Sequence, residues 1–297
     1  MELKRRTFLK SVGVAGAASL AAPAEAAVSR GPAPGAKGVL VDTTLCVGCR
    51  ACEAACAEFN RLPDPEQAGE ARVYDSRRET GPQTFTVVNR ADRLAPNGEE
   101  RFAKSQCLHC VESACVSACP VRALEKLEAG PVVYRANRCI GCRYCMLSCP
   151  FGVPKYEYDK AVPYVRKCTF CAERQAQGQP PACASVCPTG ALKFGDREAL
   201  LEEARERVYG NPGRYVRKVF GEHEVGGTSW LYISDIPLES LGLKTDVGTT
   251  PIPELTSTAL SGVPFIMTLW PPILMGLYAF AKNRNGAEEA GRGGQHE

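Results

Sequence analysis

The stretch Cys139-Ile-Gly-Cys142-Arg-Tyr-Cys145-Met-Leu-Ser-Cys149-Pro150 decides the fold of this chain. Its cysteines follow the spacing C-x2-C-x2-C-x3-C. Such spacing lets one tight loop wrap three thiolates around a single cubane, whereas the fourth cysteine serves the other cluster of a pair. Gly141 lacks a Cβ, so backbone amides can approach an anionic cluster there. The stretch therefore predicts a ligand loop for a [4Fe–4S] cluster.

The arrangement recurs along the chain as an internal repeat of four cysteine groups. All 16 cysteines of the 297 residues belong to these groups. The groups are Cys46, Cys49, Cys52 and Cys56; Cys107, Cys110, Cys115 and Cys119; Cys139, Cys142, Cys145 and Cys149; and Cys168, Cys171, Cys183 and Cys187. Gly48 repeats the role of Gly141. Proline follows three of the groups, and Pro120 and Pro188 are expected to start short helices.

Three other uses of cysteine fit the pattern less well. Disulfides suit an exported chain, but three cysteines two residues apart cannot readily pair within a group. Structural zinc uses two C-x2-C pairs rather than a triplet with a trailing fourth cysteine. A c-type haem needs C-x-x-C-H, which does not occur here. His109, inside the second group, is expected to be a neighbour of a cluster rather than a ligand.

The N-terminus has the layout of a targeting segment. Arg5 and Arg6 form a twin arginine, a weakly apolar run follows to Ala22, and small residues at 24–26 offer a cleavage site. This order predicts a Tat signal peptide over residues 1–26, with a short basic amphipathic helix as the alternative. The Tat route carries folded proteins, so clusters built in the reducing cytoplasm can be exported with the chain.

A second apolar run lies near the C-terminus. No charged residue occurs from Leu260 to Ala281, a length that would span roughly 33 Å as a helix. The run predicts a transmembrane anchor over residues 257–284, and Lys282 and Arg284 favour the cytoplasmic side at its end. Prolines 264, 271 and 272 would kink such a helix. The alternative is a hydrophobic tail that docks on a partner.

The segments between these features are mixed in structure. Residues 57–106 are expected to be an insertion with one strand near Phe85–Val88. Asp196 is a plausible N-cap for a helix over 197–208, whose charges lie all round it and predict a solvated or partner-facing helix. Strands are expected at 214–220 and 229–236, and residues 237–256 are expected to be a linker. A net charge of only +3 gives no argument for nucleic acid as a partner.

The cysteine groups and their flanks resemble the four-cluster ferredoxin-like electron-transfer subunits of membrane oxidoreductases. The resemblance covers residues 40–195 and includes the stretch continuing through Phe151-Gly-Val-Pro-Lys-Tyr156. It implies an α+β fold of tandem double bacterial-ferredoxin-like modules, with short strands and helices around four clusters and a C-terminal transmembrane helix. The implied domains are residues 38–195 for the clusters and 196–256 for a partner-docking extension and linker.

The resemblance also implies how the ligands are shared, because the family pairs the first group with the fourth and the second with the third. The spacing alone supports only the exchange of fourth cysteines, not which groups pair. The implied ligand sets are Cys46, Cys49, Cys52 and Cys187 for cluster 1; Cys168, Cys171, Cys183 and Cys56 for cluster 2; Cys107, Cys110, Cys115 and Cys149 for cluster 3; and Cys139, Cys142, Cys145 and Cys119 for cluster 4.

Within the family, the two ends of the chain are most similar to the iron–sulfur subunit of hydrogenase-2. Comparable stretches include Leu45-Cys-Val-Gly-Cys-Arg-Ala-Cys52, Gln106-Cys-Leu-His-Cys110 and Gly226-Gly-Thr228. The resemblance implies a non-catalytic subunit on the periplasmic face of the inner membrane. It would pass electrons between the large and small subunits of a [NiFe] hydrogenase and a quinone-reactive membrane subunit. The alternative is the same role beside a molybdenum catalytic subunit, of formate dehydrogenase or sulfur-compound reductase type.

Overall fold

The computed structural model describes residues 31–65 and 73–292. The expected signal peptide, residues 1–26, lies outside the described residues. The described chain divides into two compact units, residues 31–253 and residues 254–292, and each is considered by itself.

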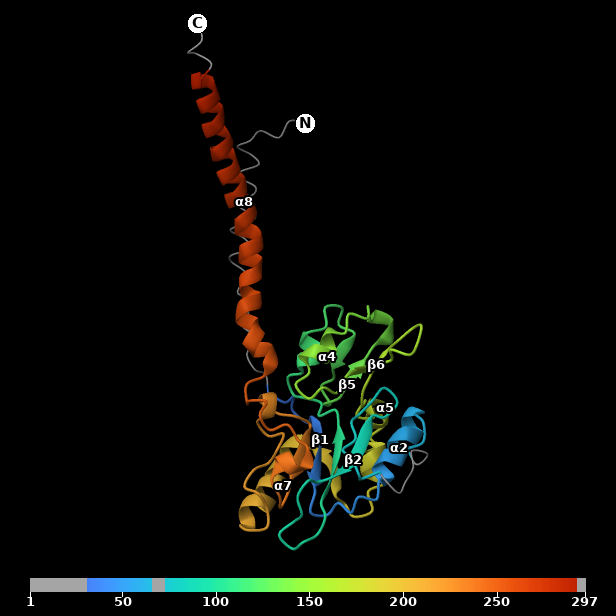
Figure 1. The fold of residues 1–297 in the computed structure, drawn as a ribbon. Helices are drawn as coiled ribbons and strands as arrows, with labels where there is room; N and C mark the ends of the chain where they lie inside the picture. Colours follow the sequence, from blue (N-terminus) through green and yellow to red (C-terminus); the bar gives the residue numbers. More distant parts are fainter. Residues whose placement is uncertain (1–30, 66–72, 293–297) are drawn as a thin grey trace. The chain divides into compact units, whose positions relative to one another are not determined.

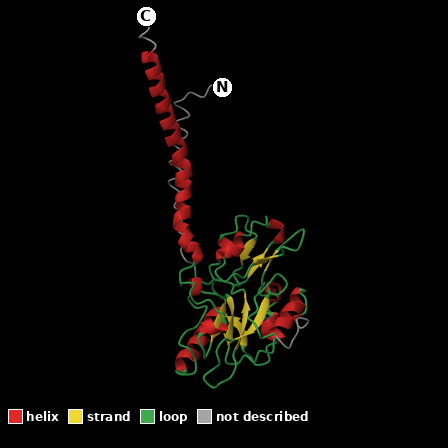
Figure 2. Ribbon diagram, in the orientation of Figure 1, coloured by secondary structure: helices red, strands yellow, loops and turns green. Residues whose placement is uncertain are grey.

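The first unit is built from short helices and strands (Figures 1 and 2). Its strands are β1 Lys37–Asp42, β2 Thr86–Arg90, β3 Phe102–Gln106, β4 Leu124–Lys126, β5 Val132–Tyr134, β6 Lys155–Tyr156, β7 Val165–Arg166, β8 Leu192–Asp196 and β9 Trp230–Ile233. Its helices are α2 Ala51–Asn60, α3 Ala114–Ser117, α4 Tyr144–Ser148, α5 Ala172–Ala176, α6 Ala182–Ser185 and α7 Arg197–Gly210, with 3₁₀ helices η3 Ala136–Arg138, η4 Glu224–Gly226 and η5 Leu238–Leu241. The expected mixture of helix and strand is confirmed.

The strands follow the cysteine repeat. A strand precedes each cysteine group by a few residues, and a turn separates β1 from the first group. A strand also follows each of the last three groups. Strand β8, after the fourth group, pairs antiparallel with β1, before the first group. Strand β4, after the second group, pairs antiparallel with β5, before the third. The first and fourth groups therefore share one sheet, and the second and third share a hairpin.

The three-stranded sheet β8-β1-β9 separates two layers of core. Strand β1 is central and runs parallel to β9. Because successive side chains in a strand point to opposite faces, Val39, Trp230 and Tyr232 pack on one side and Leu40 and Leu231 on the other. The first layer also contains cysteine side chains, so the sheet supports the cysteine loops directly.

Helix α7 covers the other face of this sheet. Leu200, Leu201, Ala204 and Val208 are buried against Leu40, Leu231 and Ile233. The expectation of a solvated or partner-facing helix was wrong, because these apolar residues form one stripe at helical spacing despite the many charges around them. Asp196 precedes the helix as expected, but its side chain pairs with Lys37 at 2.5 Å instead of capping.

Several local expectations differ from the structure. The insertion has a second strand, β3, which pairs antiparallel with β2. Pro120 and Pro188 begin turns that lead into β4 and β8 rather than helices, because Arg122 and Gly190 take positive φ values of 50° and 67° two residues later. Within the described chain, residues 214–220 form only isolated bridges, such as Phe220 with Tyr232.

Both ends of the expected linker belong to regular structure. The 3₁₀ helix η5 is buried, and Leu238 and Leu241 pack in the core with Tyr232. Beyond it, helix α8 runs over Ile252–Arg292 and contains all three prolines of the apolar run.

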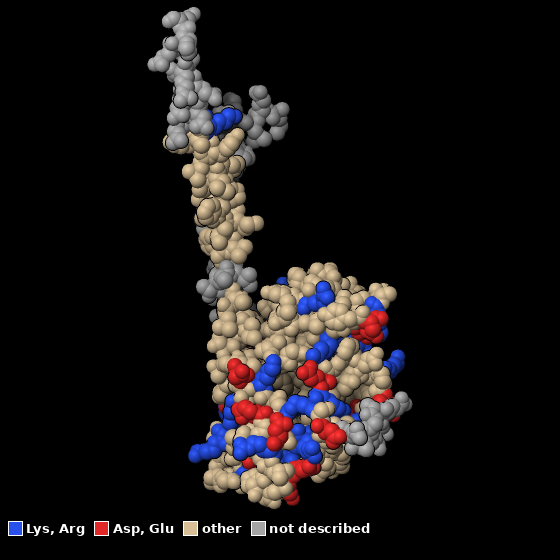
Figure 3. Space-filling view, viewed as in Figure 1, with Lys and Arg blue, Asp and Glu red and all other residues tan. Residues whose placement is uncertain are grey.

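Helix α8 is the one helix among the described residues that is long and apolar enough to cross a membrane. The candidate span is Ile252–Lys282. No charged residue occurs between Glu254 and Lys282, and Figure 3 shows this stretch without blue or red atoms. Near the first proline, the Thr268 hydroxyl donates to the Pro264 carbonyl oxygen at 2.8 Å. Such back-bonding gives a polar side chain a partner within its own helix.

Candidate iron–sulfur sites

The four C-x2-C loops share one backbone conformation. The residue before the second cysteine has a positive φ in every loop: Gly48 at 72°, His109 at 49°, Gly141 at 71° and Phe170 at 56°. This region favours glycine, so His109 and Phe170 are held there by their surroundings. Their rings stack with centroids 4.9 Å apart, which joins the second and fourth loops.

His109 is fully buried inside its loop. Its Nδ1 accepts a hydrogen bond from the Val132 amide at 2.9 Å, so the proton of the neutral ring is on Nε2. Burial lowers the pKa of His109 well below its usual value, and nearby Lys167, Lys126 and Lys104 act in the same direction. The ring is therefore neutral at ordinary pH and packs as an aromatic side chain between loops.

A segment far along the chain supports the second loop. The Val111 amide donates to the Gly227 carbonyl oxygen at 2.9 Å, and the Ser229 amide donates to that of Leu108 at 3.0 Å. The Ser229 hydroxyl also donates to the His109 carbonyl oxygen at 3.0 Å. Gly227 has a φ of 95°, and a Cβ there would lie 2.8 Å from Arg197. The resemblance singled out Gly226–Thr228, and the structure gives this stretch a supporting role.

All sixteen cysteines lie in the described ranges and have free thiols. Their electrostatic neighbours join residues that are far apart in sequence. Cys46 interacts with Cys49 and Cys187, and Cys56 interacts with Cys183 and Cys171. Cys110 interacts with Cys107, Cys115 and Cys149, and Cys145 interacts with Cys139, Cys142 and Cys119. Each of these four neighbourhoods lies within one of the ligand sets that the resemblance implies, and the sets themselves stay a prediction.

Electrostatic influence also links each set to the next, and these links give the sets an order. Cys52 interacts with Cys183, Cys168 with Cys107, and Cys115 with Cys145. The order is as follows, and we number the sets accordingly. Set one is Cys46, Cys49, Cys52 and Cys187; set two is Cys56, Cys168, Cys171 and Cys183; set three is Cys107, Cys110, Cys115 and Cys149; and set four is Cys119, Cys139, Cys142 and Cys145.

Exposure differs between the ends and the middle of this row. Cys49 and Cys142 are the two exposed cysteines, and they belong to sets one and four. Every member of set two is buried. Around set four the exposed apolar side chains are Ile140, Tyr144 and Leu147, and Val47 is exposed beside set one. Both ends of the row are thus open to a partner, and exposed apolar groups of this kind suit protein contacts.

In the iron-free chain, burial favours the protonated form of several of these thiols. Burial raises the pKa of Cys52, Cys56 and Cys115 to about 12 and that of Cys145 to about 11. Metal binding must displace these protons, because the thiolate is the ligand.

Donors are already aimed at several sulfurs. The Ala123 amide lies 3.1 Å from Cys119 Sγ, the Phe170 amide 3.3 Å from Cys168 Sγ and the Gly141 amide 3.4 Å from Cys139 Sγ. Hydrogen bonds to cluster sulfurs of this kind tune the potential of a bound cluster.

The donor set fits cubane clusters. Among residues 31–65 and 73–292, no three cysteine, histidine or carboxylate side chains converge closely enough to hold one metal ion. Convergence of that kind defines a mononuclear site, whereas each thiolate of a [4Fe–4S] cluster binds a different iron. Sixteen free thiols in four sets of four supply one thiolate per iron for four cubanes.

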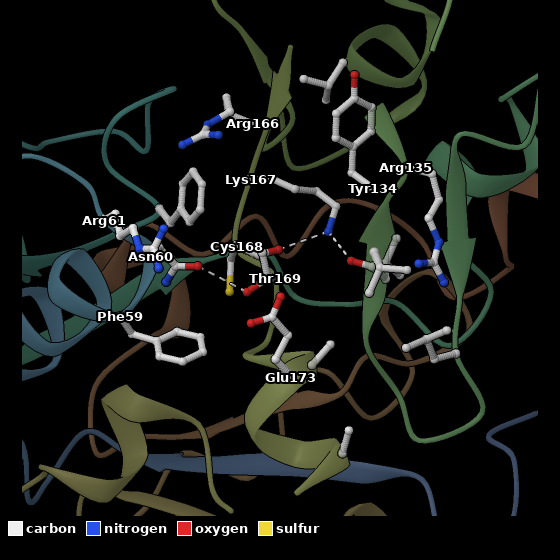
Figure 4. Close-up of a pocket in the computed structure, with 17 residues that line it drawn as sticks. Phe59, Asn60, Arg61, Tyr134, Arg135, Arg166, Lys167, Cys168, Thr169 and Glu173 are labelled. Carbon is white, nitrogen blue, oxygen red and sulfur yellow. Dashed lines mark hydrogen bonds between the residues drawn. The ribbon is translucent and has the colours of Figure 1, made fainter. Parts of the chain in front are cut away.

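A cavity of about 690 Å³ borders set two (Figure 4). Cys168 lines it, with Phe59 and Arg61 on one side of the cysteine and Tyr134 and Arg135 on the other. Lys167 Nζ donates across one side to the carbonyl oxygens of Val132, at 2.5 Å, and Cys168, at 3.0 Å. This lysine thereby joins the β4-β5 hairpin to the fourth cysteine loop.

Two further lysines lie among the sets, Lys126 half-buried and Lys104 buried. Lys126 Nζ donates to the carbonyl oxygens of His109, Cys110 and Gly130, and burial lowers its pKa to about 8. Lys104 is fully buried on β3, where its Nζ donates to Gln106 Oε1 at 2.9 Å. Burial acts to lower the pKa of Lys104, but the attraction of Cys183, Cys52, Cys168 and Cys56 outweighs it and raises the pKa above its usual value.

Sequence reasoning did not find these lysines. Lys104 alternates with ordinary strand residues, and its only signal is a position in a strand three residues before Cys107. Nothing in that position distinguishes a buried cation from a solvated one.

Together, the loops and thiol sets define a ferredoxin-type iron–sulfur protein, and comparisons with known proteins agree. Residues 99–197 match the 4Fe-4S dicluster domain family. A protein of Nitratidesulfovibrio vulgaris is 44% identical over 95% of this chain and 78% of its own length. Hydrogenase-2 operon protein HybA of Escherichia coli O157:H7 is 36% identical over 81% of this chain and 84% of its own. The nitrate-inducible formate dehydrogenase iron-sulfur subunit of E. coli K12 is 37% identical over 65% and 66%.

The chain belongs to the family of 4Fe–4S iron–sulfur subunits that includes HybA and the formate dehydrogenase iron–sulfur subunits. It is an electron-transfer iron–sulfur subunit.

Proposed function

We propose that this chain binds four [4Fe–4S] clusters, one in each thiol set, and carries electrons along them. The single observation that supports this most strongly is the grouping of sixteen free thiols into four sets of four. The sheet and hairpin that join the first group to the fourth and the second to the third support the tandem double module. Iron–sulfur clusters supply one-electron redox chemistry, and the protein holds and insulates them.

The exposure of the thiol sets also supports the two ends of the row as the points where electrons enter and leave. The buried set two has no exposed thiolate, whereas sets one and four have Cys49 and Cys142 at the surface. Electrons would enter at one end and leave at the other. The chain itself would have no catalytic site and would act only within a complex.

For the partners, we propose a periplasmic [NiFe] hydrogenase at one end and a quinone-reactive membrane subunit at the other. The similarity to HybA, which extends over most of both chains, favours this assignment. Helix α8 would anchor the chain in the inner membrane, with the cluster domain on the periplasmic face after Tat export. The second candidate is a molybdopterin oxidoreductase, because the nitrate-inducible formate dehydrogenase iron-sulfur subunit is about as identical to this chain as HybA is, over a shorter part of it.

Iron and acid-labile sulfide analysis of anaerobically purified protein tests the cluster proposal. We expect sixteen iron and sixteen sulfide per chain, because each of four cubanes contains four of each. About eight iron per chain, or stoichiometric zinc, would contradict it.

A further inference from the structure

Lys104 differs from Lys126 and Lys167 in what surrounds its charge. Lys126 and Lys167 direct their ammonium groups at backbone carbonyl oxygens. Lys104, at 2% exposed, has one uncharged acceptor, Gln106 Oε1, and its Nζ lies 4.6 Å from the centroid of the Trp230 ring. Within the described chain it has no ion pair with a carboxylate.

The position of this ammonium is fixed by a closed set of hydrogen bonds. Gln106 Nε2 donates to the Tyr232 hydroxyl at 2.7 Å, and that hydroxyl donates to the Lys104 carbonyl oxygen at 2.8 Å. Tyr232 is itself fully buried in β9. The side chain of Lys104 is thus held in one place rather than free to reach solvent.

The thiols near it belong to two different sets, and Cys52 and Cys183 pack in the same core cluster as Trp230, the ring beneath its ammonium. Cys52 belongs to set one, and Cys56, Cys168 and Cys183 belong to set two. A buried cation without a counter-charge is strongly unfavourable, so the fold must supply negative charge near it. Iron-bound thiolates and the clusters they hold would be that charge.

We propose that the Lys104 ammonium lies between clusters one and two and raises the reduction potentials of both. The inference rests on the proposed function, because it requires clusters in those sets. Reduction adds one electron, and hence one negative charge, to a cluster. A fixed positive charge in a poorly polarisable interior stabilises the reduced form more than the oxidised form. Lys104 itself gains and loses neither an electron nor a proton.

EPR-monitored redox titration of the purified full complex tests the proposal with Lys104→Met. We expect the midpoints of two of the four clusters to fall and those of the other two to stay unchanged. The expected change in the reduction equilibrium is about tenfold, or about 59 mV for a one-electron couple. Lys104→Arg keeps the positive charge, so its midpoints should stay close to those of the wild type.

The matched control is Lys193→Met, which removes the same charge from a side chain that is 53% exposed and paired with Glu203. Solvent screens that charge, so its loss should leave all four midpoints unchanged. Unmoved midpoints in Lys104→Met, or an equal fall of all four, would overturn the inference.

If Lys104→Met loses iron, Gln106→Glu decides instead. It places a carboxylate on the ammonium without removing it and keeps the side chain almost the same size, so the same midpoints should fall. Unmoved midpoints would then overturn the inference. Iron analysis distinguishes failure of this inference from failure of the proposed function. Sixteen iron with unmoved midpoints would reject only the role of Lys104. About eight iron in the wild type would reject the four-cluster proposal as well.

Discussion

Addition of a single methyl group at position 48 should strain the first ligand loop. Gly48 has a φ of 72°, and a Cβ there would lie 2.8–2.9 Å from three atoms of the Phe102 ring. Gly48→Ala should therefore add a backbone cost of roughly 1–2 kcal/mol and an overpacking cost of about 1–3 kcal/mol. Bleaching of the cluster absorbance in urea measures the combined effect.

Gly178→Ala is the matched control for that substitution. Gly178 has a similar φ of 74°, but nothing lies within 4 Å of its Cβ position. The control should show the backbone cost alone. Equal sensitivity to urea in the two variants would mean that the contact with Phe102 contributes nothing.

The buried thiols predict how the iron-free protein responds to alkali. Burial raises the pKa of Cys52, Cys56 and Cys115 from 9.0 to about 12 in the folded chain. Between pH 9 and 12 the unfolded chain releases these protons while the folded chain keeps them. The free energy of unfolding should then fall by about 1.4 kcal/mol per pH unit for each thiol.

Urea unfolding of chelator-treated protein at pH 8 and pH 10, followed by circular dichroism, checks this dependence. Cys56→Ser removes one titrating thiol and should make the fall less steep. A free energy of unfolding that is unchanged over this range would contradict the prediction.

At the scale of single residues, the ligands and the buried cations differ in how well the sequence predicts them. Cysteine spacing predicts a ligand loop because the chemistry requires thiolates at fixed intervals. The burial and surroundings of the Lys104 ammonium depend on Trp230, Tyr232 and cysteines of other groups. These residues lie more than a hundred residues away or in another loop. No local pattern includes that information.

Among the elements, α2 is joined to the insertion by a buried carboxylate. Glu53 accepts hydrogen bonds from Arg50 Nε at 3.2 Å and from Arg78, and also from the Val88 amide. Glu53→Ala would remove the carboxylate from two partly buried arginines, which would keep only the carbonyl oxygens of Pro65 and Val88 as acceptors, and would remove an acceptor from the Val88 amide. We expect a loss of about 3–5 kcal/mol in the free energy of unfolding.

Glu58→Ala, in the same helix, is the control. Glu58 is exposed, so its removal should change the free energy of unfolding by no more than about 0.5 kcal/mol. Equal losses in the two variants, measured by the urea resistance of the clusters, would show that the burial of Glu53 is unimportant.

The elements also show why some sequence predictions failed. In α7 a narrow apolar stripe was hidden among charges, although Leu200, Ala204 and Val208 follow helical spacing. After Pro120 and Pro188 the chain reverses at Arg122 and Gly190. Such reversals depend on the adjoining strand pairs β4-β5 and β8-β1, which form between distant segments.

For the whole molecule, the partner assignment predicts the phenotype of a deletion strain. Loss of this chain should abolish hydrogen-dependent quinone reduction, while hydrogen oxidation with an artificial dye continues. The dye accepts electrons before they reach the clusters, so it does not need them. Respiration assays on membranes with quinone and with dye measure both activities.

Expression of the wild-type chain from a plasmid is the control and should restore quinone reduction. Normal hydrogen-dependent quinone reduction in the deletion strain would reject the hydrogenase partner. The cluster proposal would be unaffected, and loss of formate-dependent respiration would favour the molybdenum enzyme instead.

The sheet β8-β1-β9 has a consequence for biosynthesis. Strand β1 pairs with β8 and β9, and about 150 residues separate Asp42 from Leu192. At about 5–20 residues per second, the ribosome needs roughly 8–30 s to make that segment. Cys46, Cys49 and Cys52 therefore emerge long before Cys187 and before either partner of β1. Throughout that interval these thiols would depend on the reducing cytoplasm, and a first set that includes Cys187 could close only after roughly two thirds of the chain has been made.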